Sequence, residues 1–489
     1  MSTIPNSPAL AKTAPAKASP KGVQKVLHRL DMTLFTVSAV LIVDQLTASA
    51  AIGLQSIFWW LVTLIFFFVP YGLIVAELGS NYPQEGGIYA WVRRAFGARW
   101  AGRTAWLWWV NVAFWMPAVF ILFAGVLSDL LTLELSLLSK IGIALLLTWL
   151  TVGVNVLTLD ISKWIPNIGA VCKVGVMLAI GIGGIVYAVR FGVANEFSLT
   201  SLSPSWSASL AFLPVIVYNY LGLELMSGAG DEMKNPARDV PLAIITSGLM
   251  IAFFYIFATV GILLALPVAD IGLISGLVDT FRRIFGDSAL GNALVMLLGI
   301  MALFSLIANM VSWTLGANRS AAEAAKNGDL PAFFARMHPS FGTPVGSSVL
   351  CGVIASVVIV VYGMLAKNAE ELFWTTFAFS SVVFLLPYLV LFLAFLKLRK
   401  MQPERKPPMV VETAATQKPY RVPGGFTVAL ILSLICMAFI VQSVIFFIFK
   451  PGAFDADYAV AVTVGVVLTI IGGEFLVRFA RRHTEQQHA

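Results

Sequence analysis

The chain has 489 residues, of which 59% are hydrophobic and 12% charged, whereas soluble globular proteins are roughly 45–50% apolar and about 25% charged. This composition excludes an ordinary soluble enzyme and indicates one large membrane unit. The three cysteines lie far apart in apolar runs, and the four histidines lie in polar segments. We therefore expect no disulfide framework, no zinc site and no cofactor.

Residues 1 to 31 are rich in Ala, Pro, Ser and Lys and contain no apolar run. This pattern predicts a disordered cytosolic tail and not a cleaved signal peptide. Beyond the tail, a membrane-spanning helix needs about 20 apolar residues. By that measure the sequence predicts an all-α membrane protein with twelve transmembrane helices, near residues 32–54, 57–79, 101–130, 139–158, 164–190, 208–230, 239–266, 289–317, 346–365, 371–397, 426–449 and 458–478.

The basic residues support this topology, because Lys and Arg accumulate in the cytosolic connections of membrane proteins. With the N-terminus in the cytosol, 25 of the 32 Lys and Arg residues fall in inside segments and 6 in outside segments, and Lys173 falls within a span. The split predicts a multi-pass membrane protein with both termini in the cytosol. The net charge of +7 is then a topology signal, and nucleic-acid binding is not expected.

Three ionisable residues fall at membrane depth, where charge is costly and usually functional. Asp44 lies in a polar patch of the first span, beside Gln45, and Lys173 lies in the middle of the fifth span. Glu224 lies in the sixth span. Alternatively, Asp44 and Lys173 neutralise each other as a buried pair, and Glu224 is a helix-capping or water-facing carboxylate.

The sixth span also carries signals of an interrupted helix. Gly222 lies near two further glycines and close to Asn219, and glycine weakens a helix while an amide side chain can pair with freed backbone groups. A broken membrane helix is tolerated where its backbone lines a cavity. Close helix packing through small residues is the alternative.

The eighth span places three polar residues on one face, at spacings of four and three residues. They would face the same cavity as the sixth span, or only bond a neighbouring helix. These residues are Ser305, Asn309 and Ser312.

Two aromatic residues stand beside the polar stretches. Tyr218 and Trp313 would stack on an amine-bearing substrate and close over it. Most other aromatics are expected to contact lipid or the membrane interface, including Trp106, Trp108 and Trp109 near a span end.

Four ordered motifs resemble the amino acid, polyamine and organocation transporter superfamily. Residues 77 to 89 read E-L-G-S-N-Y-P-Q-E-G-G-I-Y, similar to that family's E-L-x-x-x-x-P-x-x-G-G-x-Y signature. Residues 222 to 236 resemble its G-x-E followed by K-N-P, residues 316 to 344 its G-A-N-R through G-T-P loop, and residues 418 to 425 its K-P-Y-R-V-P-G-G segment. The resemblance covers residues 30 to about 480.

The resemblance implies a leucine-transporter-type fold with two inverted five-helix repeats and broken helices 1 and 6. Residues 32–398 would form this transport core, 399–425 a cytosolic loop, 426–478 helices 11 and 12, and 479–489 a cytosolic tail. The same resemblance implies gating roles for Tyr218 and Trp313 and a carboxylate role for Glu224. Lys173 is similar in position to a lysine that replaces sodium in proton-coupled members, and burial would favour its release of a proton.

One departure concerns the first span, where the family's usual G-S-G is replaced by Val43, Asp44 and Gln45. An acidic group there would attract an amine and repel a carboxylate unless it is protonated. The glutamate/GABA antiporters and polyamine permeases, which this chain resembles, also lack those glycines.

The sequence therefore predicts a secondary transporter, proton-coupled, that moves polyamines or amino acids across the membrane by alternating access. Its partners would be a small amine or amino acid, protons and the lipid bilayer, and it would be a monomer or a homodimer. A glutamate/GABA-type exchanger and a non-transporting amino acid sensor are the alternatives. The sequence contains no recognisable pair of nucleophile and base and no phosphate-binding loop, so we do not expect an enzyme.

Overall fold

The computed structural model describes residues 33, 36–37, 39–43, 45–83, 86–157, 161–204, 213–225, 236–286, 288–401, 419–450 and 454–488. Asp44 and the predicted tail 1–31 lie outside these residues, as does most of the predicted loop 399–425. Within the described part, the regular structure is helical apart from one isolated β-bridge between Met337 and Pro344.

Ten helices in the described residues are long and apolar enough to cross a membrane. The prediction of twelve spans stays a prediction, because the first and sixth spans are described only in part. The ten are α3 continued by η1 and α4 (Gln55–Thr63, Leu64–Phe68, Val69–Asn81), α6 (Ala98–Leu130), α7 (Leu137–Leu157), α8 (Ile161–Phe191), α11 (Pro236–Ala265), α13 (Ala289–Lys326), α14 (Val345–Leu365), α15 (Ala369–Met401), α16 (Gly425–Ile448) and α17 (Ala456–His488).

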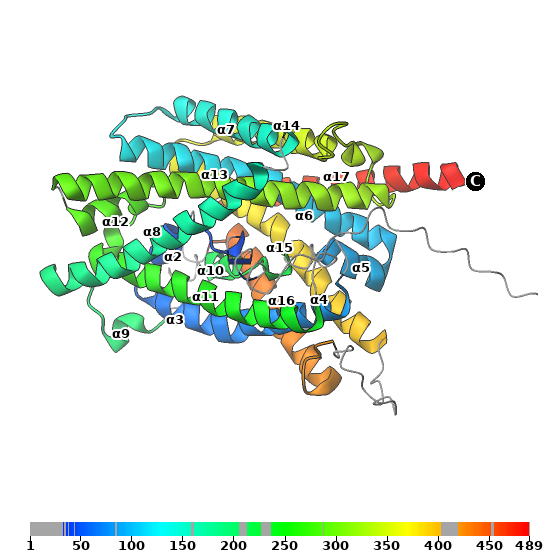
Figure 1. Cartoon of the computed structure of the whole chain (residues 1–489), viewed down its shortest axis with the longest axis horizontal. Helices are drawn as coiled ribbons and strands as arrows, with labels where there is room; N and C mark the ends of the chain where they lie inside the picture. Colours follow the sequence, from blue (N-terminus) through cyan, green and yellow to red (C-terminus); the bar gives the residue numbers. More distant parts are fainter. Residues whose placement is uncertain are drawn as a thin grey trace, which may run out of the picture.

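Short helices connect or interrupt these spans. Figure 1 shows α9 and α12 at one end of the molecule, and α5 with the C-terminal end of α17 at the other. This arrangement agrees with spans that alternate in direction along the chain. The short elements are α2 (Leu46–Ala50), α5 (Ile88–Phe96), α9 (Leu199–Leu202), α10 (Leu213–Asn219), α12 (Gly276–Phe285), η4 (Val268–Asp270) and η5 (Ala332–Ala335).

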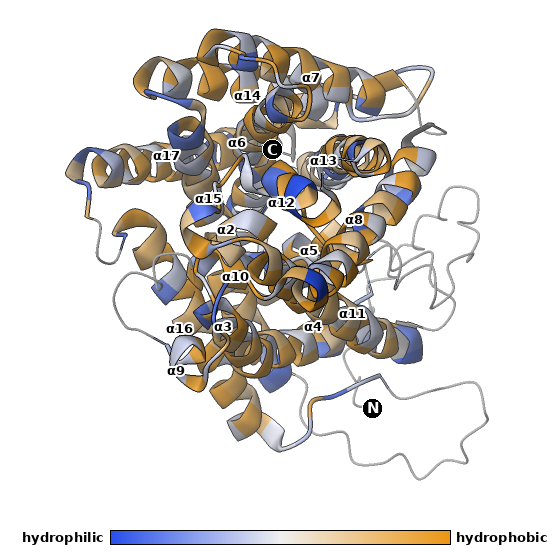
Figure 2. Ribbon diagram, turned by 90° about the vertical axis from the view of Figure 1, so that its left-hand side faces the viewer, coloured by the Kyte–Doolittle hydropathy of each residue, from blue (hydrophilic) through white to orange (hydrophobic). Residues whose placement is uncertain are grey.

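The first and sixth spans are both interrupted. The first is helical at its described positions up to Val40, leaves the helix at residues 41–43, and resumes as α2. In the sixth, α10 ends at Asn219, and Gly222 has a φ of +112° before a short 3-10 turn at residues 223–225. Short α2 and α10 pack together near the middle of the bundle, and Figure 2 shows them among the longer helices.

The second span bends where its sequence lacks a backbone donor. Pro70 has no N–H and cannot complete an ordinary helical ladder, and the preceding residues Leu64–Phe68 form a π-helical turn. Such π-helical turns inside α-helices are frequent at functional sites. Here the ring of Phe68 stacks on Tyr220 at 4.4 Å, and Tyr71 reaches the break of the sixth span.

Figure 2 shows that the helices are predominantly hydrophobic, and the outer ones expose large apolar side chains. Val189 on α8 is 82% exposed and Met364 on α14 is 75% exposed, which suits lipid contact and not water. The inner helices differ. In α6, 89% of an apolar stretch of 18 residues is buried inside the protein, so its side chains face other helices.

A buried ion pair holds the segment before α16 at the predicted cytosolic end. The guanidinium of Arg399 donates to the carboxylate of Glu77 and, at 2.7 Å, to the carbonyl of Val422. The Val422 N–H donates to the same carboxylate at 2.6 Å, and Asn81 Nδ2 donates to the Tyr420 carbonyl at 2.8 Å. We call this group the Glu77–Arg399 clasp. It joins the ends of α4 and α15 to residues 420–422.

Candidate functional site

The break in the first span is stabilised by two side chains from other helices. A broken helix leaves backbone donors and acceptors without intrahelical partners. The hydroxyl of Tyr255 on α11 accepts from the Ile42 N–H and donates to the Val40 carbonyl, both at 2.8 Å. The indole N–H of Trp313 on α13 donates to the Ala39 carbonyl at 3.0 Å. The predicted gate residue therefore contacts the first span directly.

The break in the sixth span is organised around Glu224. Its carboxylate is buried and accepts hydrogen bonds from two tyrosine hydroxyls, that of Tyr71 on α4 and that of Tyr388 on α15, the second at 2.6 Å. The Tyr71 hydroxyl also accepts from the N–H groups of Gly222 at 3.2 Å and Leu223 at 3.1 Å. One phenol thus binds both the freed backbone and the carboxylate, and the predicted carboxylate lies at the break.

Gly222 allows the two breaks to approach each other. A Cβ at this position would lie 3.1 Å from Cγ2 of Val40 and 3.4 Å from the ring of Trp313. The left-handed φ of Gly222 is also one that residues with a side chain rarely adopt. The glycine thereby lets the sixth-span backbone lie directly against the first span and the Trp313 ring.

Tyr218 and Trp313 belong to one aromatic enclosure. Tyr218 contacts Phe384 of α15 at 5.3 Å between ring centroids, and Trp313 contacts the same ring at 5.7 Å. Trp115 of α6 bridges them, at 6.1 Å from Tyr218 and 5.6 Å from Trp313. The side chains predicted to gate the site therefore form a continuous wall drawn from four helices.

Lys173 reaches the same region from α8. Its side chain is 2% exposed, and its ammonium donates to Oδ1 of Asn309 at 2.7 Å. Asn309 lies four residues, about one helical turn, before Trp313 on α13. The structure thus places the fifth-span lysine one turn from the aromatic enclosure. Ser305 and Ser312 instead donate to carbonyls of their own helix, so Asn309 alone of the predicted polar face bonds another helix through these contacts.

Gln45 and Asn219 are buried at the two breaks, Gln45 immediately before α2 and Asn219 at the end of α10. Neither amide atom of Asn219 has a hydrogen-bond partner among the described residues. The predicted anchor Asp44 lies outside the described residues, so its binding of a substrate ammonium stays a prediction, as does the alternative that it pairs with Lys173.

The helix α5 contacts the sixth-span break at its start and, through its side chains, Asp329 beyond the end of α13. A Cβ added to Gly87 would lie 3.6 Å from the Glu224 carbonyl, so the start of α5 abuts the break. On α5, the Tyr89 hydroxyl donates to Asp329 at 2.6 Å, and Arg93 pairs with the same carboxylate at 2.8 Å. Burial, and then the neighbouring Asp329, raise the pKa of Tyr89, so this hydroxyl stays a donor at neutral pH.

Sequence reasoning misses three tyrosines of the site. Tyr71, Tyr388 and Tyr255 carry no local signal, because each lies in an apolar run of another span and its partner is distant in sequence. Only the packing of the helices brings their hydroxyls to the two breaks.

The prediction that three tryptophans of α6 contact lipid or the membrane interface is wrong. Trp106, Trp108 and Trp109 are 7%, 8% and 0% exposed, and the ring of Trp108 lies 6.0 Å from that of Trp313. The reason is that α6 begins at Ala98, which places Trp108 about 15 Å inside the helix at 1.5 Å per residue.

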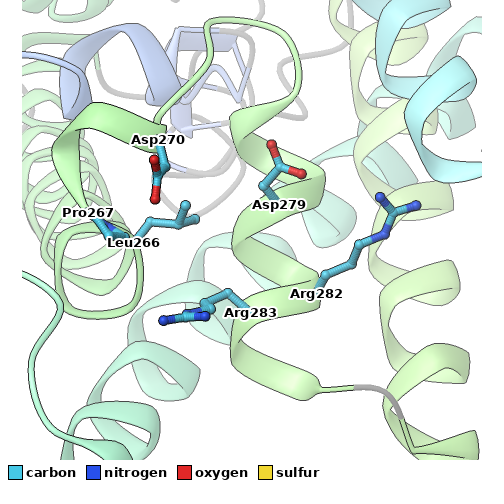
Figure 3. Close-up of a pocket in the computed structure, with 6 residues that line it drawn as sticks. All are labelled: Leu266, Pro267, Asp270, Asp279, Arg282 and Arg283. Carbon is cyan, nitrogen blue, oxygen red and sulfur yellow. The ribbon is translucent and has the colours of Figure 1, made fainter.

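A separate hollow lies between the end of α11 and α12. It has a volume of about 330 Å³ and is lined by acidic, basic and apolar residues that Figure 3 draws on both sides of the gap. None of the predicted site residues lines it. The lining residues are Leu266, Pro267, Asp270, Asp279, Arg282 and Arg283.

Two interrupted membrane helices that meet beside buried ionisable groups and an aromatic enclosure are typical of membrane permeases. The comparison with protein families agrees. The sequence profile of the family described as "Amino acid permease" matches residues 27–471. The chain belongs to the amino acid permease family.

Three relatives illustrate the range of this similarity. A probable agmatine/putrescine antiporter of Lactococcus lactis is 35% identical over 449 residues, covering 91% of this chain and 93% of the relative. An uncharacterised transporter of Legionella pneumophila is 30% identical, covering 84% and 86%. A glutamate/gamma-aminobutyrate antiporter of Lactococcus lactis is 23% identical, covering 82% and 79%.

Proposed function

We propose that this chain is a secondary transporter that exchanges organic amines across the membrane by alternating access, with polyamines or agmatine-like compounds as substrates. The observation that carries the proposal is the meeting of the two helix breaks under Trp313, inside the aromatic enclosure. Aromatic faces attract cations, and freed backbone groups bind the polar parts of a substrate. The 35% identical relative named as an agmatine/putrescine antiporter supports the same class of substrate.

In this proposal each predicted residue has a defined role. Asp44 holds a substrate ammonium, and Gln45, Asn219 and the backbone at Gly222 provide polar contacts. Tyr218 and Trp313 close over the substrate.

The proposal assigns proton coupling to two buried groups. Lys173 and Glu224 are both about 2% exposed. Lys173 donates to the amide of Asn309, and Glu224 accepts from two tyrosine hydroxyls; amides and hydroxyls can pair with either protonation state of such groups. A proton that binds or leaves either group changes the charge beside the helix breaks. The energetic cost of buried charge then links that change to the conformation of the breaks.

The test uses purified protein in proteoliposomes. We expect labelled putrescine to enter faster when the vesicles are preloaded with putrescine or agmatine, and an imposed pH gradient to change the rate. Glutamate or GABA as the better counter-substrate would favour the amino acid exchanger instead. Ligand-dependent thermal stabilisation without flux of any of these compounds would favour a sensor.

Proton coupling is tested separately with Glu224→Gln. The glutamine side chain cannot ionise, but its amide oxygen and nitrogen occupy the positions of the two carboxylate oxygens. We expect this variant to retain exchange and to show a weaker response to pH, because only Lys173 of the two groups can still change its charge. Glu323→Gln, at a solvent-accessible pair with Lys326, is the matched control and should keep the response. Uptake driven by sodium and indifferent to pH would contradict the coupling.

A further inference from the structure

Another buried asparagine lies at the site and has no role in the proposed function. Asn111 on α6 is fully buried, and neither its amide oxygen nor its amide nitrogen has a hydrogen-bond partner among the described residues. Buried polar groups are nearly always paired, and leaving one unpaired is costly. A side chain with both atoms free therefore suggests a partner that comes from outside the protein.

The neighbours of Asn111 place it at the wall of the aromatic enclosure. Trp108 and Trp115 are three residues before it and four residues after it, so the three side chains share one face of α6. The rings of both tryptophans lie within 6.0 Å of the Trp313 ring, and Trp115 also contacts Tyr218. The indole N–H groups of Trp108 and Trp115 likewise have no partner among the described residues.

The chemistry of this face suits an organic cation. An amide oxygen accepts hydrogen bonds from an ammonium or guanidinium group, and tryptophan faces are the strongest aromatic partners for cations. A carboxylate on the ligand would find only weak neutral donors in Asn111 and the two indoles. Trp313 also contacts both helix breaks, where the proposed function places the first charged end of the substrate.

We propose that Asn111 determines specificity for dibasic amines by binding the second cationic group of the substrate, with Trp108 and Trp115 beside it. This inference rests on the proposed function, because it assumes that an amine occupies the site. The proposed role of Asn111 explains how the site would select substrates with two cationic groups over substrates with one. The helix breaks alone would not make this distinction.

The experiment compares two ligands of equal chain length, putrescine with two ammonium groups and butylamine with one. Dissociation constants are measured on the purified full chain. We expect Asn111→Leu, which keeps the approximate volume, to weaken putrescine binding by about tenfold or more, as for the loss of a hydrogen bond to a charged group. Binding of butylamine should change by less than about threefold, within the usual effect of a neutral substitution.

Asn155→Leu is the matched control. Asn155 on α7 is also buried with both amide atoms unpartnered among the described residues, but the neighbouring Val156 carbonyl accepts from Thr343 just before the start of α14. It therefore lies near the start of α14, and neither α7 nor α14 contributes a ring to the enclosure as described above. We expect Asn155→Leu to leave the ratio of the two dissociation constants unchanged.

A second variant keeps the inference testable if Asn111→Leu folds poorly. Asn111→Asp places a negative charge at the same atoms and should increase the preference for putrescine over butylamine. Equal effects of either Asn111 variant on both ligands, or no effect on either, would overturn the inference while the proposed function stands. If the unmodified protein binds neither ligand, the proposed function fails first.

Discussion

The two tyrosines that hold Glu224 are not equivalent, because Tyr71 binds the backbone as well as the carboxylate. Tyr71→Phe removes one donor to Glu224 and one acceptor for two N–H groups, whereas Tyr388→Phe removes only a donor. Leaving a buried polar group unpaired costs about 1–3 kcal/mol. We expect Tyr71→Phe to lower the thermal unfolding temperature more than Tyr388→Phe does.

Both variants can be measured by thermal unfolding in detergent with the same preparation. Tyr187→Phe is a suitable control, because its ring packs on Phe191 at the end of α8, remote from the breaks. Equal destabilisation by Tyr71→Phe and Tyr388→Phe would show that the contacts of Tyr71 with Gly222 and Leu223 contribute nothing measurable.

Gly222 offers a second prediction for a single residue. Gly222→Ala would force a side chain into a left-handed backbone and against Val40, at a cost of about 1–3 kcal/mol. We expect lower thermal stability and reduced transport. Gly142→Ala in α7 is the control: a Cβ there meets nothing within 4 Å, and alanine in a helix interior is about 0.5–1 kcal/mol more favourable than glycine. A Gly222→Ala protein as stable as Gly142→Ala would contradict the assignment.

At the level of contacts between helices, the Glu77–Arg399 clasp gives a prediction about stability. Removing one partner of a buried ion pair costs about 3–5 kcal/mol, because the other charge is left unpaired, whereas replacing both is often nearly neutral. We therefore expect Arg399→Met alone to destabilise the protein more than the double variant Glu77→Gln with Arg399→Met. Thermal unfolding of the single and double variants measures the difference.

The exposed pair of Lys326 and Glu323 is the comparison for the clasp. The two side chains are 53% and 36% exposed, and such surface pairs contribute about 0–1 kcal/mol. Lys326→Ala should change stability little. If Arg399→Met were equally mild, the segment at residues 420–422 would not depend on the clasp.

At the level of helices, the length of an apolar run predicts the described spans well. The predicted end of a span falls where polar residues begin, even if the helix continues beyond them. The span predicted at 139–158 is α7, Leu137–Leu157. The span predicted at 289–317 continues as helix to Lys326, because a helix can leave the hydrocarbon while hydropathy counts only its apolar part. Glycine and asparagine predict the interruption of the sixth span. The π-helical turn before Pro70 is not predictable in this way, because proline alone does not distinguish a kink from a bulge.

For the whole molecule, the orientation of the bundle is open to a direct test. Leu199 in α9 is 87% exposed and lies on the predicted outer side, and Ser340 is exposed in the connection before α14 on the predicted cytosolic side. With the native cysteines replaced, we expect a membrane-impermeant maleimide to label Leu199→Cys in intact cells. It should label Ser340→Cys only after the membrane is permeabilised. The reverse pattern would invert the topology.

The site as a whole is only partly predictable from the sequence. Glu224, Lys173, Tyr218 and Trp313 stand out because charge or aromatic character is unusual beside glycine and polar residues in a span. Their partners do not stand out, because contacts such as that between Tyr388 and Glu224 join residues 164 positions apart. Nothing in the sequence around such a tyrosine distinguishes it from one that faces lipid.

Tyr255 has a mechanical consequence for any opening of the site. Its hydroxyl joins α11 to Val40, the last helical residue before the discontinuity in the first span, and to Ile42 within it, and Thr33 adds a second link to α11 through Thr246 at 3.0 Å. These hydrogen bonds couple the first span to α11 more tightly than packing alone would. The indole of Trp313 also ties the first span to α13 at Ala39, so a displacement of the first span relative to α13 breaks this hydrogen bond.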